Sequence, residues 1–193
     1  MYVRDAKNRE EVWLLDHIEA MGLDDAAFRS RDYVVALDEE TNEKAGFGRL
    51  RVHKTDEGDY CELTGIGVLD AWRGQGVGAH VIERLVEYAS DEGFDVVYSL
   101  TSADRYLTQF GFERIETSAL PPRLQERLEE KRENIQPDAV PLRVAHDDFT
   151  VPPRFRERFK NASAHEAEPE PEDTAEDFGI DPDEATYKYD TGR

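Results

Sequence analysis

Glycine and arginine cluster at residues 73–78, where the sequence reads RGQGVG directly before a stretch with helical periodicity. Glycine has no Cβ, so its backbone N–H group can approach a ligand closely. The first N–H groups of a helix also have no partner within the helix and carry a partial positive charge. Together these features are typical of a site for a phosphate group. The spacing matches neither the GxxxxGK[ST] loop nor the GxGxxG fingerprint, and a tight turn without a ligand is the alternative.

A β-prone run interrupted by glycines precedes this loop. Residues 60–69 read YCELTGIGVL, with Gly65 and Gly67 inside the run. Glycines inside a strand often mark a bulge or a close approach by another backbone. We therefore expect an irregular strand that leads directly into the glycine-rich loop.

Hydrophobic periodicity predicts a long helix after the loop. Val77, Val81, Leu85 and Ala89 recur at every fourth position and form one apolar face. Strands are predicted at residues 2–4, 33–37, 45–53, 60–69, 95–100, 112–115 and 140–144. Further helices are predicted at residues 12–21, 24–29, 103–109, 123–133 and 152–159. The mixed order predicts an α+β protein with at least one parallel crossover around the long helix.

The net charge argues against two classes of partner. The 193 residues include 44 acidic and 24 basic side chains, a formal charge of −20. Proteins that bind nucleic acid or anionic membranes carry basic patches, so neither partner is expected. An acid-rich surface also suits concentrated salt, where charge repulsion is screened within about 3 Å at about 1 M. We interpret the charge as a sign of a halophilic source, and an ordinary acidic protein with an acidic tail is the alternative.

Cysteine use and hydropathy indicate a cytoplasmic protein. Cys61 is the single cysteine, so no internal disulfide can form, and no Cys/His cluster suggests a metal site. No apolar run approaches the roughly 20 residues that span a bilayer, and the first residues, MYVRDAKNREEVW, lack the apolar core of a signal peptide. We therefore expect a cytoplasmic location without a bound metal.

The composition changes near residue 160. Residues 161–193 are rich in Pro, Glu and Asp, with eleven acidic side chains from Glu166 to Asp190. Such a segment buries too little apolar surface to offset the entropy cost of ordering it. We expect one domain over residues 1–160 and a disordered acidic tail over residues 161–193. Docking of the aromatic end of the tail on the domain or on a partner is the alternative.

Three motifs together resemble the GNAT family of N-acetyltransferases. The loop RGQGVG is similar to the family's Q/R-x-x-G-x-G/A motif, and ELTGIGV at residues 62–68 resembles its fourth strand. TSADRYLTQFGF at residues 101–112 resembles its A-x-x-F-Y-x-x-x-G-F segment. The motifs occur in the family's order and cover roughly residues 44–116. The resemblance implies the GNAT fold, a mixed central sheet with a bulged, splayed fourth strand and flanking helices.

The resemblance also implies a site for acetyl-CoA as co-substrate. Backbone groups of Ile66, Gly67 and Val68 would pair with its pantetheine arm like an added strand, and one N–H would stabilise the developing oxyanion. Arg73 would hold the pyrophosphate. Backbone N–H groups would assist it from Gly74, Gln75, Gly76, Val77, Gly78 and Ala79. In the implied reaction an amine attacks the thioester directly in a ternary complex, without a metal.

An amine must lose a proton before it attacks, so the implied reaction needs a base within reach. Our candidate is Glu62, because it lies on the expected pantetheine strand, where family members often carry such a carboxylate. A Glu62 that faces solvent, or pairs with an arginine of the neighbouring strand such as Arg49 or Arg51, is the alternative.

The usual acid of the family is missing. Members place a tyrosine at the second aromatic position of A-x-x-F-Y-x-x-x-G-F, but alignment on Gly111 and Phe112 puts Leu107 there and Tyr106 one residue earlier. One residue turns a helical side chain by about 100°. Tyr106 is therefore a candidate catalytic residue for which we favour a second role, packing or lining the CoA channel.

This departure resembles amino-acid N-acetyltransferases of the N-acetylglutamate synthase type, which carry hydrophobic residues at that place. The segments Leu100-Thr101 and Phe110-Gly111-Phe112 also match their pattern. A free amino acid needs its carboxylate held, most simply by a bidentate arginine. Arg49 and Arg51 are the candidate substrate ligands, and a plain surface charge is the alternative for each.

The sequence therefore predicts an acetyl-CoA-dependent N-acetyltransferase that acts on a primary amine, either a free amino acid or another small amine. Acetylation of a protein N-terminus or lysine is the second hypothesis. A non-catalytic acetyl-CoA-binding module is the third. The expected partner is a small-molecule amine, and the sequence leaves a homodimer open.

Overall fold

The computed structural model describes residues 1–164 of the chain, and these residues form one mixed sheet. Its strands are β1 (Tyr2–Asp5), β2 (Tyr33–Leu37), β3 (Lys44–Thr55), β4 (Gly58–Val68), β5 (Val96–Thr101), β6 (Glu113–Arg114) and β7 (Val140–Ala145). They lie side by side in the order β1-β2-β3-β4-β5-β7-β6. β4 and β5 are parallel and the other pairs are antiparallel, so the predicted α+β class and parallel crossover are confirmed.

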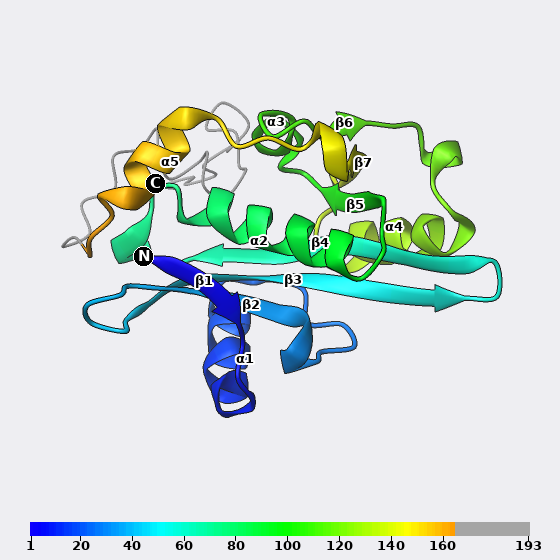
Figure 1. The fold of residues 1–193 in the computed structure, drawn as a ribbon. Helices are drawn as coiled ribbons and strands as arrows, with labels where there is room; N and C mark the ends of the chain where they lie inside the picture. Colours follow the sequence, from blue (N-terminus) through cyan, green and yellow to red (C-terminus); the bar gives the residue numbers. More distant parts are fainter. Residues whose placement is uncertain (165–193) are drawn as a thin grey trace, which may run out of the picture.

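Helices cover both faces of this sheet. The described part contains α1 (Glu11–Ala20), α2 (Val77–Asp91), α3 (Asp104–Thr108), α4 (Pro122–Asn134) and α5 (Pro153–Lys160). It also contains the 3-10 turns η1 (Asn8–Glu10), η2 (Ser30–Asp32), η3 (Asp70–Trp72), η4 (Thr117–Ala119) and η5 (His146–Asp148). In Figure 1, α1 lies below the sheet and α2 lies above it, so the two helices cover opposite faces.

The apolar faces predicted from the sequence form the cores. Val77, Val81, Leu85 and Ala89 of α2 are fully buried in the main core. On the other face α1 buries Leu14 and Ile18 against Tyr33 and Phe47. A third cluster joins Leu124 and Leu128 of α4 to Leu100 of β5. α4 therefore packs close to the point where β4 and β5 meet.

β4 is bulged, as the glycines predict. Phe47 of β3 pairs with Gly67, but Arg49 pairs with Thr64, so β4 holds one extra residue between them. Gly65 adopts a left-handed φ of +62°, a conformation that favours glycine. β4 then pairs with β5 only over residues 61–63, and the two strands separate beyond this point. The predicted bulge and splay of the fourth strand are confirmed.

The predicted helix at residues 24–29 is wrong. The Asp24 carboxylate accepts a hydrogen bond from the Ala26 N–H at 2.9 Å, and Ala27 adopts a φ of +49°. A local side-chain hydrogen bond of this kind offers the backbone an alternative to helix. The segment is instead an irregular loop after α1.

The chain beyond α5 is described only as far as residue 164. Ala162 still packs against the main core, although residue 161 is the expected start of the acidic tail. Residues 165–193, which make up most of that expected tail, lie outside the described residues. No helix within residues 1–164 combines the length and apolarity needed to cross a membrane.

Candidate active site

A pocket of about 330 Å³ opens where β4 and β5 separate. β4 contributes Leu63, Thr64, Gly65 and Ile66, and the segment from β5 into α3 contributes Thr101, Ser102, Ala103, Tyr106 and Leu107. The loop after α1 adds Leu23 and Asp24, and α4 adds Lys131. The charged side chains in this wall are one carboxylate, Asp24, and one ammonium group, Lys131.

Glu62 lies behind this wall with no exposed surface. His53 Nε2 lies 2.9 Å from its Oε1, and Arg127 Nε donates to the same oxygen at 3.2 Å. Lys131 Nζ lies 3.5 Å from Oε2. The carboxylate is thus surrounded by donors, and Lys131 connects it to the pocket.

Both cations near Glu62 come from α4. Arg127 and Lys131 are four residues apart, so they lie on the same face of the helix and can both reach Glu62. Arg127 also forms an ion pair with Asp24. Lys131 Nζ donates to Thr64 Oγ1 at 3.1 Å and to the Leu100 carbonyl at 2.7 Å. Buried charges persist when they are paired and hydrogen-bonded, as they are here.

Burial and the neighbouring charges shift the pKa values of Glu62 and Lys131 in opposite directions. Burial alone would raise the pKa of Glu62, but the Lys131 ammonium and the hydrogen bond from His53 outweigh it and hold the pKa below its ordinary value. Burial lowers the pKa of Lys131, and Glu62 offsets only part of that effect. The pair is therefore a carboxylate and an ammonium group whose proton is held less tightly than in water.

Sequence reasoning missed Asp24, Arg127 and Lys131. A signal was present on α4, where the buried positions Leu124, Arg127, Leu128 and Lys131 follow helical spacing. Two cations on the apolar face of a helix need acidic partners in the interior, because an unpaired buried charge is costly. Asp24 carried no comparable signal, because it was assigned to a helix that does not form.

Arg49 and Arg51 neighbour the pocket from β3 without lining it. The buried Arg49 guanidinium donates to the carbonyls of Ala26 and Ala27 at 2.7 and 2.6 Å and to Asp32 at 3.0 Å. It thereby holds the loop that presents Asp24. Arg51 lies opposite Glu62 in register, and its buried Nη1 has no hydrogen-bond partner within residues 1–164. Substrate binding by either arginine stays a prediction.

Tyr106 and Leu107 both line the pocket from α3. The Tyr106 ring packs edge-on against Phe110, with centroids 5.1 Å apart, and the residue is 5 % exposed. This is the placement expected for a residue that shapes the pocket. A catalytic role for Tyr106 stays a prediction.

The glycine-rich loop has the backbone that its sequence suggests. Gly74 and Gly76 adopt left-handed φ values of +71° and +76°, and Gly76 directly precedes α2. The N–H groups of Val77, Gly78 and Ala79 lie in the first turn of α2, where they have no partner within the helix. Arg73 forms an ion pair with Asp70 at 2.7 Å. The loop thus combines backbone donors with an arginine.

The three residues of the expected pantetheine strand differ in placement. Ile66 lines the pocket, whereas Val68 is buried in the main core. A Cβ on Gly67 would lie 2.6 Å from the Phe47 ring. Packing against Phe47 is therefore enough to require glycine at position 67.

The described residues offer neither a metal centre nor a reactive thiol. Across residues 1–164, no group of three His, Cys, Asp or Glu side chains lies in a position to hold a metal ion. The buried Cys61 thiol donates to the Val96 carbonyl at 3.4 Å, and burial raises its pKa to about 12. A thiol this far from ionisation is a poor nucleophile.

Comparison with known proteins decides the family. Residues 2–112 match the model of the acetyltransferase (GNAT) family. The chain belongs to the GNAT family. A sequence search of curated proteins gives no match.

Solved GNAT-fold structures resemble this GNAT protein at low identity. Rv2747 from Mycobacterium tuberculosis, in complex with CoA and NLQ, is 18% identical with a TM-score of 0.62, over 75% of this chain and 99% of that chain. N-acetylglutamate synthase from Neisseria gonorrhoeae, with coenzyme A and N-acetyl-glutamate, is 15% identical with a TM-score of 0.59. That match covers 74% of this chain and 34% of the synthase, so this chain spans about a third of the synthase's length.

A third solved structure, of a plant protein, also resembles the chain. Arabidopsis thaliana Naa50, in complex with the bisubstrate analogue CoA-Ac-MVNAL, is 14% identical with a TM-score of 0.53, over 74% of this chain and 97% of that chain. At these identities the similarity shows the GNAT fold alone.

Proposed function

We propose that this GNAT protein transfers the acetyl group of acetyl-CoA to the primary amine of a free amino acid. The observation that carries the proposal is that one carboxylate, Asp24, and one ammonium group, Lys131, both line a pocket at the split between β4 and β5. The proposal has three parts: the fit of acetyl-CoA, the recognition of the acceptor and the path of the proton.

The residues present fit acetyl-CoA. The bulge at Gly65 opens the edge of β4, whose backbone can then pair with an extended pantetheine arm. The loop at residues 73–79 offers backbone donors and Arg73 to a pyrophosphate. The CoA bound in the Mycobacterium and Neisseria structures supports the same assignment for this chain. Acetyl-CoA supplies the thioester that the amine attacks.

The acceptor is recognised as a zwitterion. Asp24 is suited to the acceptor's ammonium group, and Lys131 to its carboxylate. A plain monoamine would bring no carboxylate to the side of Lys131 that lines the pocket, and a polyamine would place a second cation against it. The amino acid is the small amine that satisfies both side chains.

The acceptor's proton passes to Glu62 through Lys131. Lys131 transfers one proton to Glu62 and takes one from the acceptor's ammonium group, so Lys131 ends as ammonium, Glu62 as carboxylic acid and the acceptor as a neutral amine. The neutral Glu62–Lys131 pair forms only in passing, because Lys131 and His53 favour the carboxylate form of Glu62 and hold its pKa below the ordinary value despite burial. Glu62 keeps the role of base expected from the sequence, but Lys131 is the group that passes it the acceptor's proton.

The test is release of free CoA with pooled acceptors in concentrated KCl: the protein amino acids, polyamines and short peptides. Turnover with amino acids supports the proposal. Turnover with peptides alone would replace it with protein acetylation. Binding of acetyl-CoA without turnover of any pool would indicate a non-catalytic acetyl-CoA-binding module.

A further inference from the structure

The last described segment of the chain lies against the glycine-rich loop. α5 and the residues that follow it fall outside the family match, which ends at residue 112. Figure 1 shows α5 beside the start of α2, where the loop ends. We call residues 153–163 the C-terminal strap.

The strap is hydrogen-bonded to the loop through Gln75. Gln75 Nε2 donates to the Ser163 carbonyl at 2.9 Å, and the Ser163 N–H donates to Gln75 Oε1 at 2.9 Å. Gln75 is 8% exposed, whereas Ser163 is exposed, so the two bonds are partly buried. The pair joins two points 88 residues apart and fixes the loop residue between Gly74 and Gly76.

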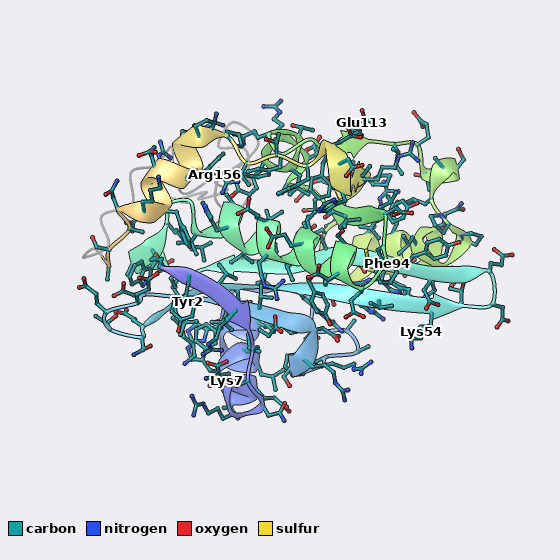
Figure 2. All side chains as sticks on the ribbon, in the orientation of Figure 1. Tyr2, Lys7, Lys54, Phe94, Glu113 and Arg156 are labelled. Atoms are coloured by element: carbon teal, nitrogen blue, oxygen red, sulfur yellow. The ribbon has the colours of Figure 1, made fainter. Side chains whose placement is uncertain are left out.

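Two further contacts hold the strap to the first turns of α2. The Phe159 ring stacks on His80 with centroids 3.8 Å apart and an angle of 8°. His80 Nδ1 lies 2.8 Å from the Gly76 carbonyl, which can only accept, so this nitrogen carries the proton. Arg156, labelled in Figure 2, forms a bidentate pair with Glu83 at 2.6 and 3.2 Å.

Backbone contact is equally close at Gly76. A Cβ added there would lie 2.4 Å from the Phe155 carbonyl oxygen. Phe155 itself is buried in the main core, which fixes the position of α5. The shape of the loop is thus set from outside by the strap as well as from inside by its glycines.

The strap also brings positive charge to the loop of an acidic protein. α5 reads PRFRERFK, with four basic residues and one acid. Arg156 pairs with Glu83, and Arg158 Nη1 lies 3.5 Å from the Gly74 carbonyl. Its guanidinium therefore lies at the same loop as Arg73 and approaches it from a separate element.

We propose that the C-terminal strap is part of the acetyl-CoA site: Arg158 binds the pyrophosphate, and the Gln75–Ser163 pair holds the loop in the shape that receives it. This inference rests on the proposed function, because it assumes that acetyl-CoA binds at residues 73–79. It assigns Arg158 as a binding residue and Gln75 as a positioning residue that acts through the loop backbone.

The test compares acetyl-CoA with acetyl-pantetheine, which lacks the pyrophosphate. Competition calorimetry on the full chain gives the dissociation constant of each ligand for wild type, Arg158→Gln and Gln75→Ala. Arg158→Gln raises the constant for acetyl-CoA about tenfold relative to that for acetyl-pantetheine, as loss of a charged hydrogen bond implies. Gln75→Ala shifts the same ratio in the same direction. The salt dependence of acetyl-CoA binding becomes shallower in Arg158→Gln alone.

Arg154→Gln is the matched control, because Arg154 lies on α5 but bonds to Gln109 and not to the loop. An equal rise in Arg154→Gln and Arg158→Gln would reduce the effect to net charge and overturn the inference. Unchanged ratios in Arg158→Gln and Gln75→Ala, with wild type binding acetyl-CoA, would overturn it and leave the proposed function intact. A wild type that does not bind acetyl-CoA would overturn both.

Discussion

Glu62 and Lys131 form a buried pair at the back of the pocket, with Oε2 and Nζ 3.5 Å apart. Glu62 comes from β4 and Lys131 from α4, so the contact joins the sheet to the helix that covers it. Each charge is stabilised mainly by the other and by the hydrogen bonds around them. Removing Glu62 therefore takes away the acidic partner of Lys131 in the interior, whereas removing Lys131 leaves Glu62 with Arg127 and His53.

The stability losses of single substitutions at Glu62 and Lys131 should not be additive. Glu62→Gln should lower the free energy of unfolding by about 3–5 kcal/mol, because it removes the acidic partner of the buried Lys131. Lys131→Met should cost less, because Arg127 and His53 still face Glu62. The double variant should lose clearly less than the two single losses added. Urea unfolding measures all three. Lys54→Met, at an exposed position of β3, is the control and should change stability by less than about 0.5 kcal/mol. Additive losses would contradict a coupled pair.

The same pair should control turnover. If the proton passes through Lys131 to Glu62, both Glu62→Gln and Lys131→Met should reduce kcat at least about 100-fold. The dissociation constant of acetyl-CoA should stay near that of wild type, since neither side chain contacts the loop at residues 73–79. Steady-state kinetics on folded fractions, verified by thermal melts, gives both values. Lys131→Met with unchanged kcat would remove Lys131 from the proton path.

Replacement of Tyr106 should have a small effect. The ring lines the pocket and packs on Phe110, and Tyr106→Phe keeps that packing. We therefore expect kcat to fall less than about threefold, well below the effect of losing a general acid. A fall of about 100-fold or more would instead assign Tyr106 as the acid for the departing thiolate.

Glycine at position 76 should be essential. Gly76→Ala places a side chain in the left-handed region and drives its Cβ to 2.4 Å from the Phe155 carbonyl. We expect a loss of about 3 kcal/mol or more in stability, with weak binding of acetyl-CoA. Gly22→Ala is the control, because Gly22 has a similar φ of +64° but nothing within 4 Å of its Cβ position. It should cost only about 1 kcal/mol. Equal losses in both variants would mean that the contact with the strap has no importance.

Acid should remove a stabilising contribution at the N-terminus. The Arg4 guanidinium donates to both oxygens of Glu10 and, despite burial, lowers the pKa of Glu10 to about 2, with help from the Lys7 N–H. A depressed native pKa stabilises the fold fully above the unfolded value of about 4.5 and is lost as the pH falls toward 2. Glu10→Gln should therefore lose about 2–3 kcal/mol at neutral pH.

The difference in free energy of unfolding between Glu10→Gln and wild type should shrink as the pH falls from about 4.5 to 2. Chemical unfolding at each pH measures this difference. Glu11→Gln, at an exposed neighbouring position, is the control and should change stability by less than about 0.5 kcal/mol at neutral pH. A deficit that does not change with pH would assign the effect of Glu10 to packing.

The parts of the site that rest on local backbone chemistry could be predicted from the sequence. The bulge at Gly65 and the turn at Gly76 depend on the ability of glycine to adopt a positive φ. Glycines at these positions are visible in the sequence itself. The long helix α2 followed from its apolar period. These features were enough to place the glycine-rich loop and the irregular strand that leads into it.

The parts that depend on distant contacts could not be predicted. Arg49 stabilises the irregular loop at residues 24–29 by donating to two of its carbonyls. Local propensity cannot indicate this stabilisation, because Arg49 is distant from the loop in the sequence. Lys131 lies 69 residues from Glu62 along the chain, and their contact depends on how α4 packs against the sheet. The Gln75–Ser163 pair spans a still longer separation.

Because Glu62 has no exposed surface, dissolved ions cannot reach it. Salt screens the interactions of exposed charges, over about 3 Å at about 1 M. It screens the interactions of buried charges much less. Arg73 and Arg158 at the loop touch water and are subject to that screening. A change in salinity should therefore alter the affinity for an anionic co-substrate at the loop more than it alters the proposed proton transfer between Lys131 and Glu62.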